Sequence, residues 1–315
     1  MTQNYSEELL RLAFEEHDNC VSCGYVFVKG DTTHLGYDPE NRPLYVCDSC
    51  SSQLEETVVR HVFSPRPYEA PPKNSHLWRY MDFTKYVSML SSSGLYFSRA
   101  DRFDDHFEGA KGIISRKDEW DKHYLSFFEE IIKNPPEDNE CKLSKHEIKR
   151  ETIRLLRELE KGGELQRKKV FISCWHENEY ESEAMWKLYS SYMDNAIAIK
   201  TTYSSLYKAL GKNPSIYIGR VKYIDYSKNY AGVNDSFWRK RKSFSYENEV
   251  RAIIHDHECK ARGKIIECDL DTLIEELYVS PSAPTWFVSL INDVNNKYGL
   301  DVEVSPSNLN EQPFY

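Results

Sequence analysis

Two C-x-x-C pairs near the N-terminus restrict the fold of this chain more than any other feature of its sequence. The first pair is Cys20 and Cys23, the second is Cys47 and Cys50, and 23 residues separate the pairs. Two such pairs can direct four thiolates at one Zn²⁺ in a tetrahedron. Four sulfur ligands leave no position for water or substrate, so we predict a structural zinc site.

A proline-rich stretch follows and indicates a domain boundary. Residues 64–74 contain four prolines, which favour an extended, semi-rigid linker. We therefore predict a zinc module over residues 1–63, a linker over 64–74 and a larger domain over 75–315. The spacing of the cysteines resembles that of a zinc ribbon or treble clef, and such a module could dock a partner protein.

The composition limits the binding partners and the cellular compartment that we expect for the chain. A net charge of −9 argues against general coating of nucleic acid, which requires a basic surface. No run approaches 18 apolar residues, and the N-terminus lacks a basic segment followed by an apolar one. Paired cysteines in a chain of 315 residues are typical of metal ligands in a reducing compartment. We expect a cytoplasmic protein without membrane contact.

Helix and strand patterns are mixed along residues 75–315 without strict alternation. Apolar and β-branched runs predict strands at 76–80, 95–98, 170–175, 196–200, 217–224, 249–254, 265–268, 277–280 and 302–304. Spacing and capping signals predict helices at 4–17, 51–62, 82–90, 117–132, 144–161, 182–193 and 284–298. Gly94 and the pair Gly162-Gly163 are expected to end two of these helices. The order favours an α+β fold with a mixed or antiparallel sheet and inserted helices.

The stretch from Lys242 to Ile254 concentrates the residues best suited to chemistry. Glu247, Glu249 and Arg251 alternate, so on a strand they share one face. The apolar residues between and after them would anchor the opposite face in a core. We predict that the polar face presents two carboxylates and a guanidinium to a groove. Sequence motifs of ordinary dinucleotide folds, P-loop NTPases, zincins and α/β-hydrolases are absent.

From Trp78 onward the chain resembles a widespread, uncharacterised bacterial domain family whose members often look like accessory or defence genes. The matching pieces are Trp78-Arg-Tyr80, Leu95-Tyr-Phe-Ser98, Phe103-Asp104, Glu108-Gly109, Cys174-Trp175, Met185-Trp186, Tyr189, Tyr246-Glu-Asn-Glu-Val-Arg251, Val279-Ser-Pro281 and Val304-Ser-Pro306. They span about three quarters of the chain. The family itself implies no chemistry.

The order of these motifs is also similar to that of ADP-ribosyltransferases. That superfamily has an Arg or His on an early strand, a Ser or Tyr on a middle strand and a Glu, often E-x-E, where a late strand begins. The corresponding residues here are Arg79, then Ser173 or Tyr96, then Glu247-x-Glu249. Ser-Cys-Trp stands where Ser-Thr-Ser would be expected. The resemblance implies an ADP-ribosyltransferase-like sheet core and NAD as substrate, in a toxin or anti-phage effector.

If the protein cleaves the nicotinamide–ribose bond of NAD, each candidate residue would have a role in the reaction. A carboxylate can stabilise the oxocarbenium-like transition state, and we assign this role to Glu249. Glu247 would receive a proton from an acceptor nucleophile, on a protein or a nucleic acid. Arg79 would bind a phosphate or ribose, and Ser173 would belong to the same NAD site. The aromatic residues able to stack on nicotinamide are Tyr96, Trp175 and Trp186.

Three alternatives stay open at this point. Glu249 and Arg251 can simply pair along a strand. The domain can be a non-catalytic sensor or adaptor whose cleft binds a phage or host molecule. Finally, the domain can be a metal-dependent nuclease that uses the acidic loop from Asp101 to Glu108, which could hold a divalent cation, with Glu247, Glu249 and the basic run 239–242.

Overall fold

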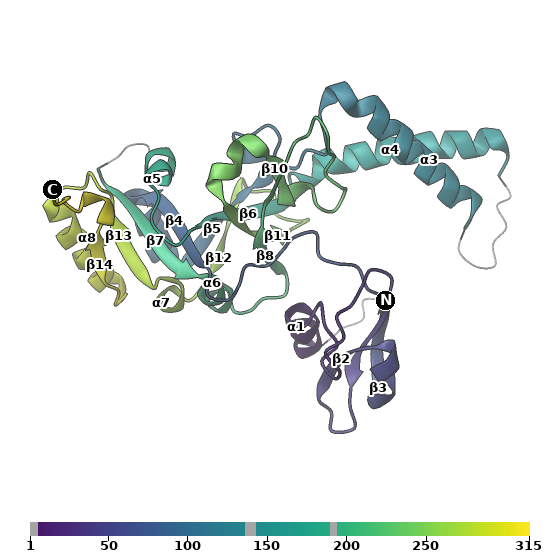
Figure 1. Cartoon of the computed structure of the whole chain (residues 1–315), viewed down its shortest axis with the longest axis horizontal. Helices are drawn as coiled ribbons and strands as arrows, with labels where there is room; N and C mark the ends of the chain where they lie inside the picture. The colour runs from purple at the N-terminus through teal and green to yellow at the C-terminus, as the bar shows by residue number, and fades with distance from the viewer. Residues whose placement is uncertain (1–5, 136–142, 190–193) are drawn as a thin grey trace.

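The computed structural model describes residues 6–135, 143–189 and 194–315. Figure 1 shows a small N-terminal lobe, a large sheet with helices on both faces, and an arm of two helices that extends away from the sheet. The predicted helix 182–193 ends partly outside the described residues, which contain α5 (Glu183–Tyr189). None of the helices in these ranges is long and apolar enough to span a membrane.

The N-terminal lobe is a three-stranded antiparallel sheet with one helix. α1 (Glu7–Glu15) begins at Ser6, whose side chain accepts a hydrogen bond from the Leu9 amide. The strands β1 (Thr32–Tyr37), β2 (Pro43–Cys47) and β3 (Glu56–Val62) are arranged in the order β2-β1-β3.

The predicted helix 51–62 is wrong. Residues 48–53 form the short 3-10 helix η1 (Asp48–Gln53), and the β-branched run Thr57-Val58-Val59 then pairs with β1 in β3. β-branched side chains lose rotamer freedom in a helix and pack well on a sheet, which explains the difference.

The linker lies against the large sheet. Tyr68 packs on Trp238 with ring centroids 4.2 Å apart, and a Cβ on Gly219 would come within 2.2 Å of the Tyr68 ring. The N-terminal lobe also contacts the rest of the chain through α1, where Phe14 stacks on Tyr207 at 5.7 Å. The division into domains at residues 64–74 stays a prediction.

A nine-stranded, mostly antiparallel sheet forms the centre of the chain, as predicted for an α+β fold. Its main path runs β12-β5-β6-β4-β7-β13-β14, and β11 pairs with both β6 and β8. Among the described strands of this sheet, only β13 and β14 pair in parallel. The strands are β4 (His76–Asp82), β5 (Gly94–Arg99), β6 (Val170–Glu177), β7 (Ala196–Thr202), β8 (Ile216–Arg220), β11 (Glu249–His255), β12 (Gly263–Glu267), β13 (Glu276–Val279) and β14 (Val304–Pro306).

The sheet opens at one edge of β6, and this opening positions the candidate site. β5 pairs with β6 at Phe171 and Ile172, whereas β4 pairs with it at His176 and Glu177. The three residues between these contacts, 173–175, pair only with β11 on the opposite edge. The neighbouring strands β4 and β5 therefore diverge and leave a gap in the sheet.

Helices cover both faces of the sheet. One face buries the main core beneath α2 (Phe83–Ser92), α6 (Tyr203–Ala209), α7 (Leu270–Leu273) and α8 (Thr285–Tyr298). On the other face, α5 packs on β4. The segment 236–247 lies on that same face and contains η4 (Ser236–Trp238), β10 (Arg239–Arg241) and η5 (Lys242–Glu247), with β10 paired to the short β9 (Lys222–Ile224).

Two helix ends differ from expectation. Ser93, not Gly94, takes the left-handed conformation after α2, with φ 46°, and Gly94 begins β5. A Cβ on Gly94 would lie 2.7 Å from the Ile266 carbonyl oxygen, so the glycine permits close pairing with β12. The pair Gly162-Gly163 lies inside α4 (Lys145–Gln166).

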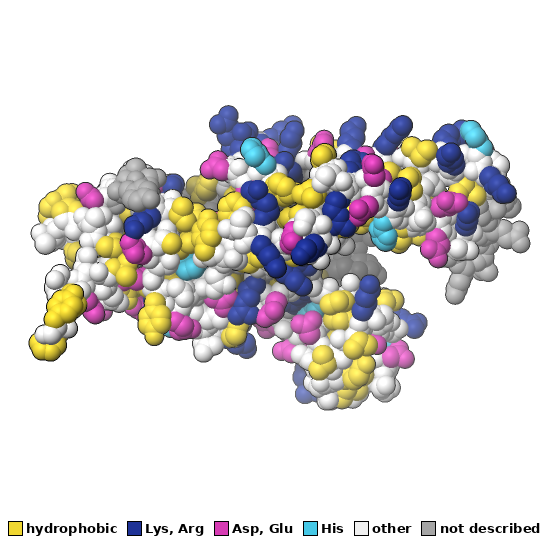
Figure 2. All heavy atoms as spheres, turned by 45° about the horizontal axis from the view of Figure 1, so that its top comes forward, with side chains coloured by type: hydrophobic (Ala, Val, Ile, Leu, Met, Phe, Trp, Pro, Cys, Tyr) yellow, Lys and Arg dark blue, Asp and Glu magenta, His cyan; other side chains and the backbone are white. Residues whose placement is uncertain are grey.

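The arm is an antiparallel pair formed by α3 (Lys117–Lys133) and α4. The predicted helix 144–161 begins with a capping box, in which Ser144 and Glu147 exchange hydrogen bonds at the start of α4. Three short 3-10 helices lie elsewhere in the chain: η2 (Ala100–Arg102), η3 (Ile114–Arg116) and η6 (Asn308–Asn310). Positive and negative side chains are interspersed along the arm in Figure 2, so this face is not a continuous basic surface.

Candidate functional site

A cleft of about 480 Å³ lies at the gap in the sheet. Residues of β4, β5 and β6 line it, α2 covers one side, and Glu249 and Lys240 line it from the other face. The volume lies in the range of small-molecule sites, roughly 300–1,000 Å³. The gap explains how side chains from opposite faces of the sheet reach the same cavity.

Arg79 bridges the gap from β4. Its guanidinium donates to the Ser173 hydroxyl and to the Tyr96 carbonyl oxygen, the latter at 3.1 Å, and lies 5.5 Å from the Trp175 ring centroid. Burial lowers the pKa of Arg79. Among the described residues no carboxylate forms an ion pair with it, so its charge is available to a ligand.

Glu249 lines the same cleft but belongs to a buried network of charges. Arg251 is fully buried and donates from Nε to Glu249 Oε1 at 2.7 Å. The same guanidinium binds both carboxylate oxygens of Glu108, at 2.6 and 2.8 Å. Lys240 Nζ donates to Glu249 Oε2 at 3.1 Å and also binds Glu247.

The predicted alternation of Glu247, Glu249 and Arg251 on one strand is only partly correct. Glu247 ends η5, and Asn248, with φ 37°, separates it from β11. The left-handed residue turns the chain so that both carboxylates meet at Lys240. Arg251 does not face a groove. It lies at zero exposure and pairs with Glu249, as one alternative reading of the sequence expected.

The network shifts the pKa values of the two glutamates in opposite directions. Burial raises the pKa of Glu249, but the charges of Arg251 and Lys240 outweigh it and lower the pKa to about 2. Burial dominates at Glu247 and raises its pKa, with Lys240 opposing and Glu249 adding to the rise. Glu249 is thus a fixed anion, whereas Glu247 accepts a proton more readily than an ordinary glutamate.

A recess of about 40 Å³ adjoins the cleft and shares five lining residues with it, including Arg79 and Glu249. His176, Tyr189 and Glu247 also line the recess. His176 Nδ1 lies 2.5 Å from the Glu247 carbonyl oxygen, and its Nε2 has no hydrogen-bond partner among the described residues. Burial lowers the pKa of His176, so the ring is neutral near pH 7.

The aromatic candidates lie in three different settings. Tyr96 is 49% exposed and lines the cleft. Trp175 is buried in the main core but reaches the recess. Trp186 lines neither cavity; its ring packs on Tyr80 at 5.0 Å and its Nε1 donates to Glu181. Ser173 is buried behind the wall, where it holds Arg79.

Three residues of the site lay outside the sequence prediction as site members: Lys240, His176 and Tyr189. Lys240 was visible only as part of a basic run, and His176 only as the neighbour of a strand. Their roles depend on pairing between β6 and β11 and on the turn at Asn248, which local patterns do not reveal.

The four cysteines of the N-terminal lobe form a cluster that could hold a metal ion such as zinc. Their sulfur atoms all lie within 4.8 Å of one another, and Cys23 and Cys47 are 3.8 Å apart. Sulfurs bound to zinc at about 2.3 Å in a tetrahedron would be about 3.8 Å apart. Gly24, with φ 71°, allows the chain to turn tightly after the first pair.

The acidic loop supplies no second metal cluster. Asp101 pairs with Arg99, Asp105 with Arg241, and Glu108 with Arg251. Over residues 6–135, 143–189 and 194–315, the four cysteines are the only group of three or more His, Cys, Asp or Glu side chains close enough to share an ion. Three of the four loop acids are bound to arginines instead.

Comparisons with protein-family models, with curated proteins and with solved structures find no match to this chain. The arguments about function therefore depend on the site itself.

Proposed function

We propose that the cleft binds NAD and that the protein cleaves its nicotinamide–ribose bond, as an ADP-ribosyltransferase or an NAD hydrolase. One observation carries the proposal: Arg79, without a carboxylate partner, and Glu249, a fixed anion, line one cleft although they extend from different strands. A cation suits the phosphates of a dinucleotide, and an anion suits the ribose, where positive charge develops.

The residues divide the work as follows. Glu249 stabilises the oxocarbenium-like ribose by its charge, which Arg251 and Lys240 hold in place. Glu247 receives the proton of the acceptor, for which its raised pKa is suited. Tyr96, at the exposed side of the cleft, offers a ring face to a flat base. With this activity, the protein would act as a bacterial toxin or an anti-phage effector.

The main alternative is a non-catalytic sensor or adaptor. It is favoured by the same ion pairs, because Arg251 and Lys240 occupy both oxygens of Glu249. In this alternative, the carboxylate of Glu249 holds the wall of a binding cleft and takes no part in a reaction.

The test compares NAD consumption by Glu249→Gln and Glu108→Gln, with and without cell extract. Each variant removes one carboxylate partner of Arg251, but only Glu249 lines the cleft. We expect turnover to fall about a hundredfold or more in Glu249→Gln and to persist in Glu108→Gln. Equal loss in both folded variants, or no NAD binding by calorimetry, would instead support the adaptor.

We also propose that the four cysteines bind Zn²⁺ as a structural ion. The fit of the sulfur spacing supports zinc, and four thiolates leave no open position for catalysis. The resulting module would then be free to dock a partner protein.

A further inference from the structure

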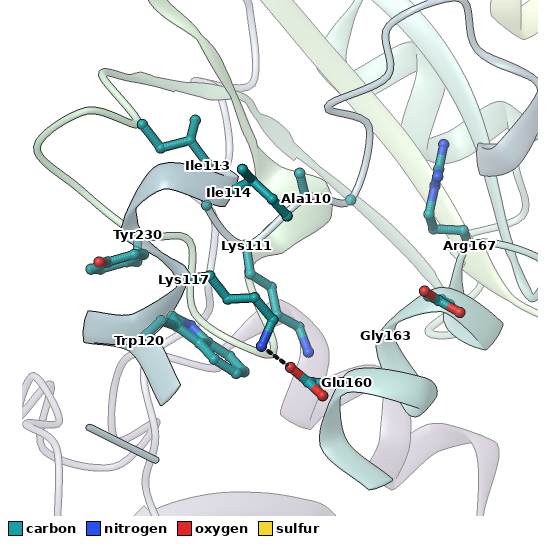
Figure 3. A pocket seen from close by; sticks show the side chains of 13 residues that line it. Ala110, Lys111, Ile113, Ile114, Lys117, Trp120, Glu160, Gly163, Arg167 and Tyr230 are labelled. Carbon is teal, nitrogen blue, oxygen red and sulfur yellow. Dashed lines mark ion pairs between the residues drawn. The ribbon is translucent and has the colours of Figure 1, made fainter. Parts of the chain in front are cut away.

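A second cavity, of about 410 Å³, lies at the base of the helical arm and shares no lining residue with the cleft. The loop before α3 forms one wall, and α3 and α4 form the others. Figure 3 shows Lys111 and Lys117 pointing into it toward Glu160, beside the ring of Trp120. Its walls combine apolar and aromatic surface with a few charged groups.

Lys111 is the side chain of this cavity that most needs explanation. It is half-buried, and burial lowers its pKa. Its ammonium donates to the Leu159 carbonyl oxygen at 3.3 Å and lies 5.4 Å from the Trp120 ring centroid. Among the described residues no carboxylate forms an ion pair with it, because Glu160 pairs with Lys117 instead. The nearby charge of Glu160 raises the pKa of Lys111 and offsets part of this burial, but a partly buried cation without a direct ion pair is still costly.

The chain makes room for this ammonium at a specific glycine. A Cβ on Gly163 would lie 2.9 Å from Lys111 Nζ, whereas a Cβ on Gly162 would meet nothing within 4 Å. Both glycines lie inside α4, where glycine lowers helix stability by about 1 kcal/mol relative to alanine. A Cβ on Gly163 would therefore displace the flexible end of the Lys111 side chain from its present position, whereas a Cβ on Gly162 would not.

We propose that this cavity binds a small anion that carries a flat apolar ring. The anionic group would meet the ammonium of Lys111, which still has donors to offer. The ring would lie against Trp120 and Tyr230, which face the same cavity. Arg167 is the third cation of the lining after Lys111 and Lys117, against the two carboxylates Glu160 and Glu164. Among the described residues no carboxylate forms an ion pair with Arg167, and its Nε has no hydrogen-bond partner.

Calorimetry with three probes tests the proposal: naphthalene-2-sulfonate, its uncharged relative 2-naphthol, and inorganic phosphate. Only the first combines ring and charge, so we expect it to bind about tenfold or more tightly than either of the others. Lys111→Gln is expected to weaken its binding about tenfold. The variant Lys168→Gln, an exposed lysine outside the cavity, should bind like the wild type.

The glycine pair supplies a matched control for folding. Gly162→Ala and Gly163→Ala should raise the stability of α4 alike, but only Gly163→Ala displaces the Lys111 ammonium. We expect weaker binding of naphthalene-2-sulfonate in Gly163→Ala alone. Equal binding by both glycine variants, equal binding of 2-naphthol, or no binding of the sulfonate at millimolar concentration would overturn the proposal.

Discussion

The N-terminal lobe and the large sheet maintain their structures by different means. The lobe has eight buried core residues among those described, and two of them, Cys20 and Cys47, belong to the four-cysteine cluster. The main core of the large sheet has 27. A region of about 60 residues gains little from hydrophobic burial, and small domains commonly depend on a metal. We therefore expect the two regions to unfold separately.

Metal removal should produce the largest difference between the two regions. A chelator, or Cys20→Ser, should unfold the lobe, since structural zinc supplies about 10–16 kcal/mol in small domains. All six tryptophans lie between Trp78 and Trp286, so their fluorescence reports only the part of the chain outside the N-terminal lobe. We expect hydrogen exchange to rise in β1–β3 while tryptophan fluorescence stays unchanged. Protected amides in β1–β3 after metal removal would show that the apolar core alone suffices.

Arg251→Met should destabilise the large sheet and leave the N-terminal lobe unchanged. The change leaves Glu108 and Glu249 buried without their shared cation, which should cost about 3–5 kcal/mol. The urea midpoint of tryptophan fluorescence should fall accordingly, with the cysteine cluster still able to bind Co²⁺. Arg157→Met, at an exposed position on α4, is the control and should change little. An unchanged midpoint in Arg251→Met would contradict the network's structural role.

Arg66→Ala sharpens the comparison at the contact between the regions. The Arg66 guanidinium lies 4.7 Å from the Phe14 ring centroid and 5.9 Å from that of Tyr68, and it donates to the Phe14 carbonyl oxygen. Its loss should weaken docking of α1 by about 1 kcal/mol. Faster hydrogen exchange in residues 64–74 would report it. Lys29→Ala, an exposed change on the lobe, should leave that exchange as in the wild type.

Acid provides the smallest test, confined to the large sheet. Burial raises the pKa of Asp82, but hydrogen bonds from Lys85 and Thr84 outweigh it and lower the pKa to about 2 from 3.8. The charge therefore adds stability above about pH 3.8 that is lost as the pH falls toward 2. Asn also caps helices well, so Asp82→Asn removes only the charge.

Above pH 5 we expect the free energy of unfolding of the wild type to exceed that of Asp82→Asn by about 0.5–1 kcal/mol. This is the usual contribution of an anion near a helix N-terminus. The difference should shrink as the pH falls through 2 and vanish below it, as measured by urea midpoints of tryptophan fluorescence. A difference that does not vary with pH would mean that the side chain acts through shape alone.

Local patterns predicted most elements of the large sheet, because apolar alternation and caps such as Asp82 and Ser144 are short-range signals. They failed for β3, where the sequence after the cysteines suggested a helix and tertiary pairing with β1 decided otherwise. They also placed the ends of α2 and α4 at glycines, although Gly94 begins β5 and Gly162-Gly163 lies inside α4.

The candidate site was predictable in its residue types and not in its geometry. Arg79 and Glu249 are about 170 positions apart, and they meet because the sheet parts at residues 173–175. The burial of Arg251 was likewise hidden, since its partner Glu108 lies on a loop that reads as exposed. The resemblance to ADP-ribosyltransferases stays a prediction.

The left-handed turn at Asn248 has a consequence for how this sequence can diverge. With φ 37° and ψ 56°, the residue occupies a region that glycine, asparagine and aspartate tolerate and β-branched side chains do not. The two carboxylates converge on Lys240 only while that conformation persists. Substitution between the glutamates is thus restricted by backbone geometry alone, so descendants that retain the site should draw this position from Asn, Gly and Asp.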